Sequence, residues 1–373
     1  MLTHSFTEKL LDLLDQAYPG KSREILAKSY LLQYINYKTK SANRGSKARG
    51  SFASLYAIYV LVEAYLKGGF VAMHTLYRES PGARFTDLLT RARSLPFGAK
   101  IQNHALNSRA NDEFHKLFPT IEARPIEREV ATQRYWINPT LLMVEVDGGD
   151  VNIAEPIIKI IDSYIEIKRG AFMKFMEQCR EIQKLADEKL EHSREFVEGL
   201  LHPNVDARIF EIVSFAILKA YYGEAVVFWG YTRNALNEDQ LTLYKTGRTN
   251  ANDGGIDFVM RPLGRFFQVT ETLDVKKYFL DIDKVQRYPI TFVVKSRETP
   301  NELKAAIEAQ ARRVYSVEVI VKRYMDCIEE IINIPALMDR FKEVVANGKL
   351  NRVLSEIVLQ SRVEFNYQDD NEE

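Results

Sequence analysis

The stretch GRTNANDGGIDFVMRPLGRFFQVTE, residues 247–271, decides the fold class of the second half of this chain. It predicts two short strands, over residues 256–261 and 265–271, because both runs are rich in apolar and aromatic residues. Pro-Leu-Gly at residues 262–264 is a turn signal between them. We therefore expect the two strands to form an antiparallel hairpin.

One carboxylate in this stretch points to chemistry. Asp257 follows Gly254 and Gly255 and is the only acid in an otherwise apolar strand. An isolated buried carboxylate is costly, so Asp257 must be solvated, paired with a cation or bound to a metal. Strand alternation allows Gln268 of the second strand to lie beside it. Oxygen ligands in this arrangement suit Mg²⁺, and Glu211 of the preceding helix is a candidate for a third oxygen.

The segments around the hairpin predict an α/β core. A helix over residues 207–221 leads into a β-rich run at 225–229, and a further strand at 290–294 precedes a helix at 301–315. We expect the run at 225–229 to be the first strand of a three-stranded meander that includes the hairpin. Helix, meander, crossover, strand and helix together make one domain of ordinary size.

The chain is longer than one compact core usually grows. Its 373 residues suggest two or three packed units, and helical periodicity dominates the first half. The predicted division is a mostly helical region over residues 1–203, the α/β core over 204–315, and C-terminal helices with an acidic tail over 316–373.

Composition excludes several classes of protein. Lys plus Arg and Asp plus Glu both number 51, so a globally basic nucleic-acid binder is excluded, although local basic surfaces are not. Two cysteines, Cys179 and Cys327, are too few for a disulfide framework, and reduced thiols in a cytoplasm are expected. The sequence shows no secretory signal at its start and no run of eighteen apolar residues, so neither secretion nor a membrane span is expected.

Three motifs occur in an order that resembles a known nuclease superfamily. RIFEIV at residues 208–213, GGID at 254–257 and FFQVTE at 266–271 resemble the motifs of the PD-(D/E)xK nucleases, especially the Mrr-like and type II restriction endonucleases. The resemblance covers residues 205 to about 315 and implies a restriction-endonuclease-like core, a mixed β-sheet flanked by helices. In that pattern Glu211 matches the helix acid, Asp257 the aspartate and Gln268 the Glu/Gln position. The chain as a whole also resembles the ApaLI-type enzymes.

The chain departs from the family pattern at one position, because Thr270 stands where the family has lysine. Another cation must then supply the charge, or the metal does most of the activation. Gln268 is also a weaker metal ligand than a carboxylate. Glu271 could offset this weakness only if the strand carries a bulge. Three hypotheses remain open: an active nuclease, a nuclease-like fold that binds without cutting, and an unrelated hairpin in which Asp257 is merely paired. The candidate cations are Lys245, Lys276, Lys277 and Lys295.

Two segments of the first half carry basic residues and no acid, over residues 36–62 and 88–111. Lys and Arg neutralise phosphates, whereas Arg, Asn and Gln read base edges, so both segments are candidate DNA-binding surfaces. The alternative is a chance cluster of charges on solvated loops. The candidate contacts are Arg44, Lys47, Arg49, Lys100, Gln102, Asn103 and Asn107.

The predicted function is sequence-specific cleavage of double-stranded DNA by a type II restriction enzyme, with Asp257, Gln268, Thr270 and Glu211 in the catalytic site. The resemblance implies hydrolysis by a Mg²⁺-activated water, a homodimer on palindromic sites, and a cognate DNA methyltransferase in the same system. Two other classes remain: a non-catalytic DNA-binding protein with a degenerate nuclease fold, and a helical interaction protein without a nucleic-acid role.

Overall fold

The computed structural model describes residues 2–40, 48–99, 101–185, 190–246 and 256–365. The chain divides into two compact units, with the boundary between Phe175 and Met176. This boundary lies inside a long helix, α7 (Ala154–Leu185), rather than at residue 203, where the sequence places the end of the helical region. None of the helices in these ranges is both long and apolar enough to span a bilayer.

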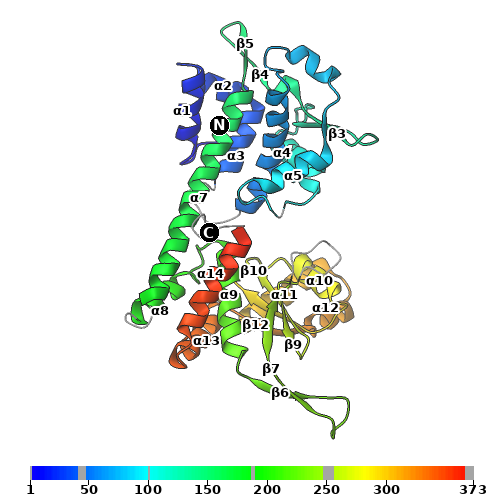
Figure 1. Cartoon of the computed structure of the whole chain (residues 1–373). Coiled ribbons are helices and arrows are strands. Elements are labelled where there is room, and N and C mark those ends of the chain that lie inside the picture. Colours follow the sequence, from blue (N-terminus) through cyan, green and yellow to red (C-terminus); the bar gives the residue numbers. More distant parts are fainter. Residues whose placement is uncertain (1, 41–47, 100, 186–189, 247–255, 366–373) are drawn as a thin grey trace. The chain divides into compact units, whose positions relative to one another are not determined.

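The first unit is mainly helical, and its core surrounds α4 (Ala48–Lys67) (Figure 1). Leu55, Tyr56 and Ile58 of this helix are fully buried, as the apolar run in its sequence predicts. The unit also contains an antiparallel sheet, in the order β1-β3-β2, and a hairpin of β4 and β5. Its other elements are α1 (Thr7–Ala17), α2 (Ser22–Lys28), α3 (Tyr30–Thr39), η1 (His74–Glu79), β1 (Ala83–Arg84), α5 (Phe85–Ser94), η2 (Ala105–Arg109), α6 (Ala110–Leu117), β2 (Ile126–Glu129), β3 (Arg134–Ile137), η3 (Pro139–Leu141), β4 (Met143–Val146) and β5 (Gly149–Asn152).

The second unit is a mixed β-sheet between two layers of helices, in the strand order β12-β11-β10-β9-β8. On one face Phe215 and Tyr222 of the helix α9 pack on Phe258 and Phe267 of the sheet. Side chains of α10, α11 and α12 form one apolar cluster with the other face. The elements of this unit are α8 (Leu190–Gly199), α9 (Ala207–Tyr222), β8 (Thr242–Lys245), β9 (Phe258–Arg261), β10 (Arg265–Thr270), α10 (Val275–Lys284), β11 (Ile290–Val294), α11 (Pro300–Val314), α12 (Glu318–Met325), β12 (Ile328–Ile332), α13 (Ile334–Ala346) and α14 (Leu350–Phe365).

The sheet joins an antiparallel meander to two parallel strands. β8, β9 and β10 are antiparallel neighbours, whereas β11 runs parallel to β10 and β12 parallel to β11, each after a helical crossover. The predicted hairpin is confirmed: Met260 opposes Arg265, and Gly264 takes the positive φ of 69° that the turn requires. The chain therefore has the predicted α/β architecture, a mixed sheet flanked by helices.

The predicted first strand of the meander is wrong. Residues 225–229 do form a strand, β6 (Val226–Trp229), but it pairs with β7 (Asn237–Gln240) in a separate two-stranded hairpin. The sheet instead begins with β8, whose Leu243 is buried. Apolar composition suggested that β6 belongs to the core, yet its side chains remain largely exposed.

The sheet also continues past residue 315. β12 forms its edge beside β11, and α13 and α14 pack against α9, as Figure 1 shows. The C-terminal segment therefore completes the α/β unit.

Candidate functional site

Asp257 immediately precedes β9 and lies directly beside Gln268 of β10. Its backbone N–H donates to the Phe267 carbonyl at 3.2 Å, and its Oδ2 accepts from the Val269 N–H at 2.8 Å. The partners of these two bonds, Phe267 and Val269, are the residues on either side of Gln268. The register of β9 with β10, in which Phe258 opposes Phe267, likewise places Asp257 opposite Gln268. Gly254 and Gly255 lie outside the described residues.

Gln268 is buried and incompletely hydrogen bonded. Its side-chain nitrogen donates a long bond of 3.5 Å to the Val269 carbonyl, and its Oε1 is buried without a hydrogen-bond partner among the described residues. An unpaired buried oxygen of this kind costs about 1–3 kcal/mol. An amide oxygen in this state is a ready ligand for a cation.

Strand alternation separates the side chains of β10 onto two faces. Phe267 contacts Tyr222 of α9, whereas Phe266 contacts Tyr288 and packs with the α10 cluster. Gln268 and Thr270 alternate with Phe266, so they share the face covered by α10. The Thr270 hydroxyl is buried and donates to the Thr272 carbonyl at 3.1 Å.

Glu211 approaches from α9, on the opposite face of the sheet, and is held by two cations. Arg208, one turn earlier on the same helix, pairs with Oε2, and Lys245 at the end of β8 lies 3.2 Å from Oε1. Burial alone would raise the pKa of Glu211, but the charges of Arg208 and Lys245 lower it below its ordinary value. Glu211 is therefore an ionised carboxylate.

The pKa of Asp257 moves in the opposite direction, to about 7. Burial is the largest cause, and the negative charge of Glu211 is the second. The Val269 N–H and the charges of Arg208 and Lys277 oppose this rise and do not cancel it. Asp257 is thus a carboxylate whose ionised form is only partly compensated by the protein.

The cations suggested by the sequence occupy different places. Lys295 is buried, donates to the Val205 carbonyl and pairs with Glu271 at 2.6 Å. Lys276 and Lys277 are exposed on the first turn of α10, and Lys277 acts on Asp257 at longer range. Lys245 is the one of the four that pairs with Glu211 in the described structure. The register of β10 with β11 is regular through Thr270, so the strand has no bulge that would turn Glu271 into the site.

The name Asp257 site is used below for Asp257, for Gln268 on the α10 face of the sheet, and for Glu211, Arg208 and Lys245 on the α9 face. The charges of Glu211 and Arg208 act on Asp257 from that opposite face. The described residues contain no group of three or more His, Cys, Asp or Glu side chains placed to hold a metal. Mg²⁺ does not need such a group, because it binds through one or two carboxylates and keeps several waters. The incompletely compensated Asp257 and the unpaired Oε1 of Gln268 fit a hard cation of this type.

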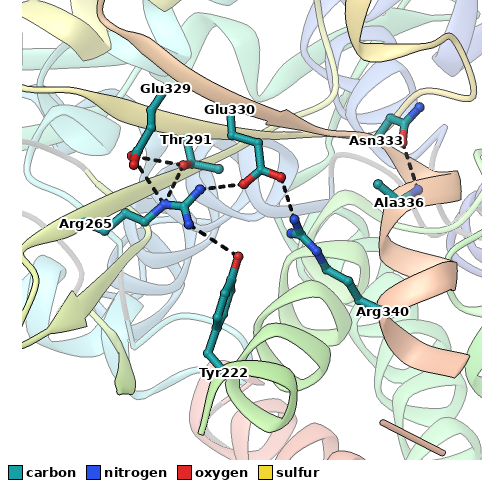
Figure 2. A network of polar contacts seen from close by, with 8 residues as sticks. All are labelled: Tyr222, Arg265, Thr291, Glu329, Glu330, Asn333, Ala336 and Arg340. Atoms are coloured by element: carbon teal, nitrogen blue, oxygen red, sulfur yellow. Dashed lines mark hydrogen bonds and ion pairs between the residues drawn. The ribbon is translucent and has the colours of Figure 1, made fainter. Parts of the chain in front are cut away.

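A second group of charges lies on the α9 face of the same sheet (Figure 2). Arg265, the first residue of β10, donates to Thr291 at 3.0 Å and to Tyr222 at 3.4 Å, and pairs with Glu329 and Glu330. Glu330 also pairs with Arg340 of α13. These six residues are called the Arg265 cluster. Burial alone would lower the pKa of Arg265, but Tyr222 and the two glutamates raise it.

Most of the candidate DNA contacts are only partly described. Arg44, Lys47 and Lys100 lie outside the described residues, and so does the side chain of Arg49 in α4. Gln102 and Asn103 are exposed, whereas Asn107 is half-buried and its Oδ1 accepts a 2.6 Å bond from the Tyr135 hydroxyl. Asn107 thus connects η2 to β3.

Several other basic residues of the two acid-free segments are paired inside the first unit. Arg91 makes a bidentate contact with Glu63, and Lys38 and Arg109 both pair with Glu113. Burial alone would raise the pKa of Glu113, but hydrogen bonds from Lys38, Ser54 and Tyr34 lower it to about 2. These cations stabilise the helical unit.

Sequence reasoning did not anticipate the part played by Arg208. The signal was present, because Arg208 and Glu211 are three residues apart in one predicted helix, a spacing at which side chains meet. The pairing of Lys245 with Glu211 has no such local signal, since it depends on how β8 packs beside α9.

Comparison of the chain with protein-family models, with curated proteins and with solved structures gives no match.

Proposed function

We propose that this protein is a metal-dependent endonuclease that cleaves double-stranded DNA at specific sites, in the manner of a type II restriction enzyme. One observation carries the proposal: a buried carboxylate with a raised pKa, Asp257, lies beside the buried and unpaired amide oxygen of Gln268. Perturbed titration combined with an unsatisfied polar atom is typical of functional sites. The sequence motifs around both residues support the same assignment.

Each residue of the Asp257 site has a distinct part in this proposal. Asp257 and Gln268 would hold Mg²⁺ through their side-chain oxygens. When bound, Mg²⁺ lowers the pKa of a water and offsets the charge that develops on the phosphate. Glu211 supports the site from α9 and fixes the ammonium of Lys245 at 3.2 Å.

Lys245 is the cation that we assign to the task of the missing motif lysine. Thr270 cannot carry charge, and its hydroxyl is engaged with Thr272. Lys295 is already held by Glu271 and a backbone carbonyl. The side chain of Lys245 is 17% exposed and pairs with Glu211 at 3.2 Å, so in the described structure it is the one of the four lysines that is held by a carboxylate of the motif set.

The partners of the protein follow from this activity. The first unit is proposed to contact DNA through the exposed Gln102 and Asn103 and through the basic segments that flank them. A homodimer would match palindromic sites, since the two-fold symmetry of protein and DNA then coincide. A cognate methyltransferase would protect the host DNA, and a cytoplasmic location is proposed accordingly.

A second candidate function is a DNA-binding protein that does not cut. Glu211 is neutralised by Arg208 and Lys245, and Thr270 is engaged in local hydrogen bonds. These pairings favour a degenerate site in which the catalytic charges have become structural.

Plasmid cleavage with Mg²⁺ distinguishes the two functions. Purified protein is expected to give discrete fragments, and Asp257→Ala to reduce the rate at least about 1,000-fold while retaining salt-dependent DNA binding. Asp283→Ala is the matched control, because Asp283 is an exposed acid of α10 that pairs with Tyr324. Cleavage that survives in Asp257→Ala excludes the proposed site, whereas binding without cleavage across Mg²⁺, Mn²⁺ and Co²⁺ supports the second candidate.

A further inference from the structure

A hollow of about 570 Å³ on the first unit is lined by three arginines. Arg78 lies in η1, Arg124 in the segment that leads into β2, and Arg128 in β2 itself. All three residues are exposed. They lie outside the two acid-free segments of the sequence, so the charge pattern that indicated DNA contacts could not select them. They are called the arginine hollow below.

Two of these arginines are unpaired in the described part of the chain. Neither Arg124 nor Arg128 makes a hydrogen bond or an ion pair with a described residue, whereas Arg78 pairs with Glu127 at 3.1 Å. Glu122 also lines the hollow. The arginine hollow therefore holds three cations and two acids, so its net charge is one positive unit.

A buried amide adds a hydrogen-bond donor to the same hollow. Asn138 lines it and is only 5% exposed. Its Oδ1 accepts from the backbone N–H of Thr140 at 3.0 Å and from the Thr140 hydroxyl at 2.7 Å. These bonds fix the orientation of the amide, because a backbone N–H cannot donate to an amino group. The Nδ2 of Asn138 is then a donor without a partner among the described residues, and it needs an acceptor that they do not supply.

Buried polar side chains hold the segments that carry these arginines. Asn111, buried in α6, accepts from the Ile126 N–H at 2.9 Å and donates to the carbonyl of the same residue at 2.8 Å, which fixes the start of β2. The Tyr77 hydroxyl, one position before Arg78, accepts from the Ile137 N–H at 3.2 Å, which fixes η1 against β3. The guanidinium groups thus extend from ordered backbone, so less conformational entropy is lost when they bind a ligand.

We propose that the arginine hollow binds one phosphodiester group of the DNA backbone, with Arg124 and Arg128 as charge partners and the Asn138 Nδ2 as a donor. Arginine suits this task because its planar group donates two parallel hydrogen bonds to phosphate oxygens. The net charge of the hollow matches the single charge of a phosphodiester, whereas a terminal phosphate carries about two. The inference rests on the proposed function, because its ligand is the DNA that the Asp257 site is proposed to cut.

Fluorescence anisotropy of a labelled duplex with the full-length protein, in EDTA so that no DNA is cut, tests the contact. In Arg124→Gln combined with Arg128→Gln we expect a dissociation constant raised at least about 10-fold. The slope of log K against log salt concentration should fall by about 1, because one phosphate contact is lost. Lys9→Gln combined with Arg23→Gln is the matched control, because it removes two exposed charges from α1 and α2. Equal affinity and equal slope in the two double variants overturn the proposal.

Asn138→Asp tests the amide separately. Aspartate keeps an acceptor for the Thr140 N–H but puts a carboxylate oxygen in place of the free donor. Duplex binding should weaken at least about 10-fold, because like charges then face each other across the contact. Circular dichroism checks that the variant is folded. Wild-type duplex affinity in a folded Asn138→Asp protein overturns the proposal.

Calorimetric titration with adenosine monophosphate separates the two sources of phosphate. We expect no saturable binding at micromolar concentrations. Micromolar binding that is lost in the arginine double variant would assign the hollow to a free phosphate monoester and overturn the proposal. Plasmid cleavage separates this inference from the proposed function. If the wild type cleaves and the double variant binds DNA normally, only the hollow is excluded; if the wild type binds through the hollow and cleaves with no divalent metal, only the nuclease is excluded.

Discussion

Strand β10 contributes one residue to the Arg265 cluster, Arg265, and one to the Asp257 site, Gln268. The two groups differ in how well their charges and hydrogen bonds are matched. In the Arg265 cluster, Arg265 and Arg340 face Glu329 and Glu330. One nitrogen of Arg340 lacks a hydrogen-bond partner, but its guanidinium lies over the ring of Tyr222 at 5.8 Å. In the Asp257 site, by contrast, the pKa of one carboxylate is raised to about 7 and one amide oxygen is unpaired.

This difference in pairing suggests that the two groups serve different purposes, one in stability and one in function. In a matched network each buried charge has a partner, and removing one partner destabilises the folded state because it leaves the other charge uncompensated. An unmatched carboxylate and an unpaired oxygen raise the free energy of the folded state, and such groups persist where a ligand compensates them. The comparison therefore assigns a stabilising part to the Arg265 cluster and a binding part to the Asp257 site. Each of the following changes tests one side of it.

The largest expected effect is a gain of stability in Asp257→Asn without divalent metal. The folded state raises the pKa of Asp257 from 3.8 to about 7, so it holds a proton that the unfolded chain has already lost between those values. Stability of the wild type therefore falls as pH rises from about 4 to 7 and stays low above 7. At pH 8 the variant should be more stable by up to roughly 4 kcal/mol, as urea unfolding in EDTA can measure.

The shape of the pH profile is the control for this prediction. The difference in unfolding free energy between the two proteins should vanish below about pH 3, where Asp257 is protonated in both the folded and the unfolded state. A constant difference across pH 4–8 would mean that asparagine stabilises by packing and that Asp257 is not strained.

The second effect is a loss of stability when the Arg265 cluster is broken. Glu330→Gln removes the charge shared by Arg265 and Arg340, whose side chains are only 19% and 16% exposed. Arg340 then loses the carboxylate it pairs with, and Arg265 keeps only Glu329. We expect a loss of about 2–3 kcal/mol in urea unfolding. Glu329→Gln is the matched control, because Glu329 is 40% exposed and should cost only about 0.5 kcal/mol. Equal losses in the two variants would contradict the assignment of Glu330 as the centre of the network.

Local patterns predicted the β9–β10 hairpin of the second unit but not the first strand of its sheet. The turn at Pro262-Leu263-Gly264 and the apolar runs on each side contain all the information that β9 and β10 need. The sequence of β6 is more apolar than that of β8, so composition alone predicts β6 as the first strand of the sheet. Packing against α9 instead places β8 there, and this tertiary contact cannot be read from either strand by itself.

The same limit applies to the candidate sites. The placement of Asp257 beside Gln268 follows from strand pairing, so sequence reasoning reached it. In the acid-free segments of the first unit, Arg91 and Arg109 pair with Glu63 and Glu113, which lie outside those segments in the sequence. A segment that has no acid in its own sequence can still lie beside acids from other segments in the folded protein.

The third effect is a metal-dependent gain of stability. At pH 8, Mg²⁺ at ten times its dissociation constant should stabilise the wild type by about 1.4 kcal/mol, because the cation binds only the folded state. Differential scanning fluorimetry should show the same shift in Glu330→Gln and none in Asp257→Asn. A full shift in Asp257→Asn would place the bound Mg²⁺ elsewhere on the protein.

The smallest effect concerns two buried polar side chains of the sheet, for which the comparison predicts opposite signs. Gln268→Met removes the unpaired Oε1 and keeps the side-chain volume, so it should stabilise the metal-free protein by about 1 kcal/mol and abolish its response to Mg²⁺. Thr291→Val, in the neighbouring strand, removes an oxygen that accepts from Arg265 at 3.0 Å, so it should destabilise by about 1 kcal/mol and leave the Mg²⁺ response intact. Urea unfolding with and without Mg²⁺ measures both values. If both substitutions destabilise equally, the Gln268 oxygen has a partner in solution and the two groups of charges on β10 do not differ in kind.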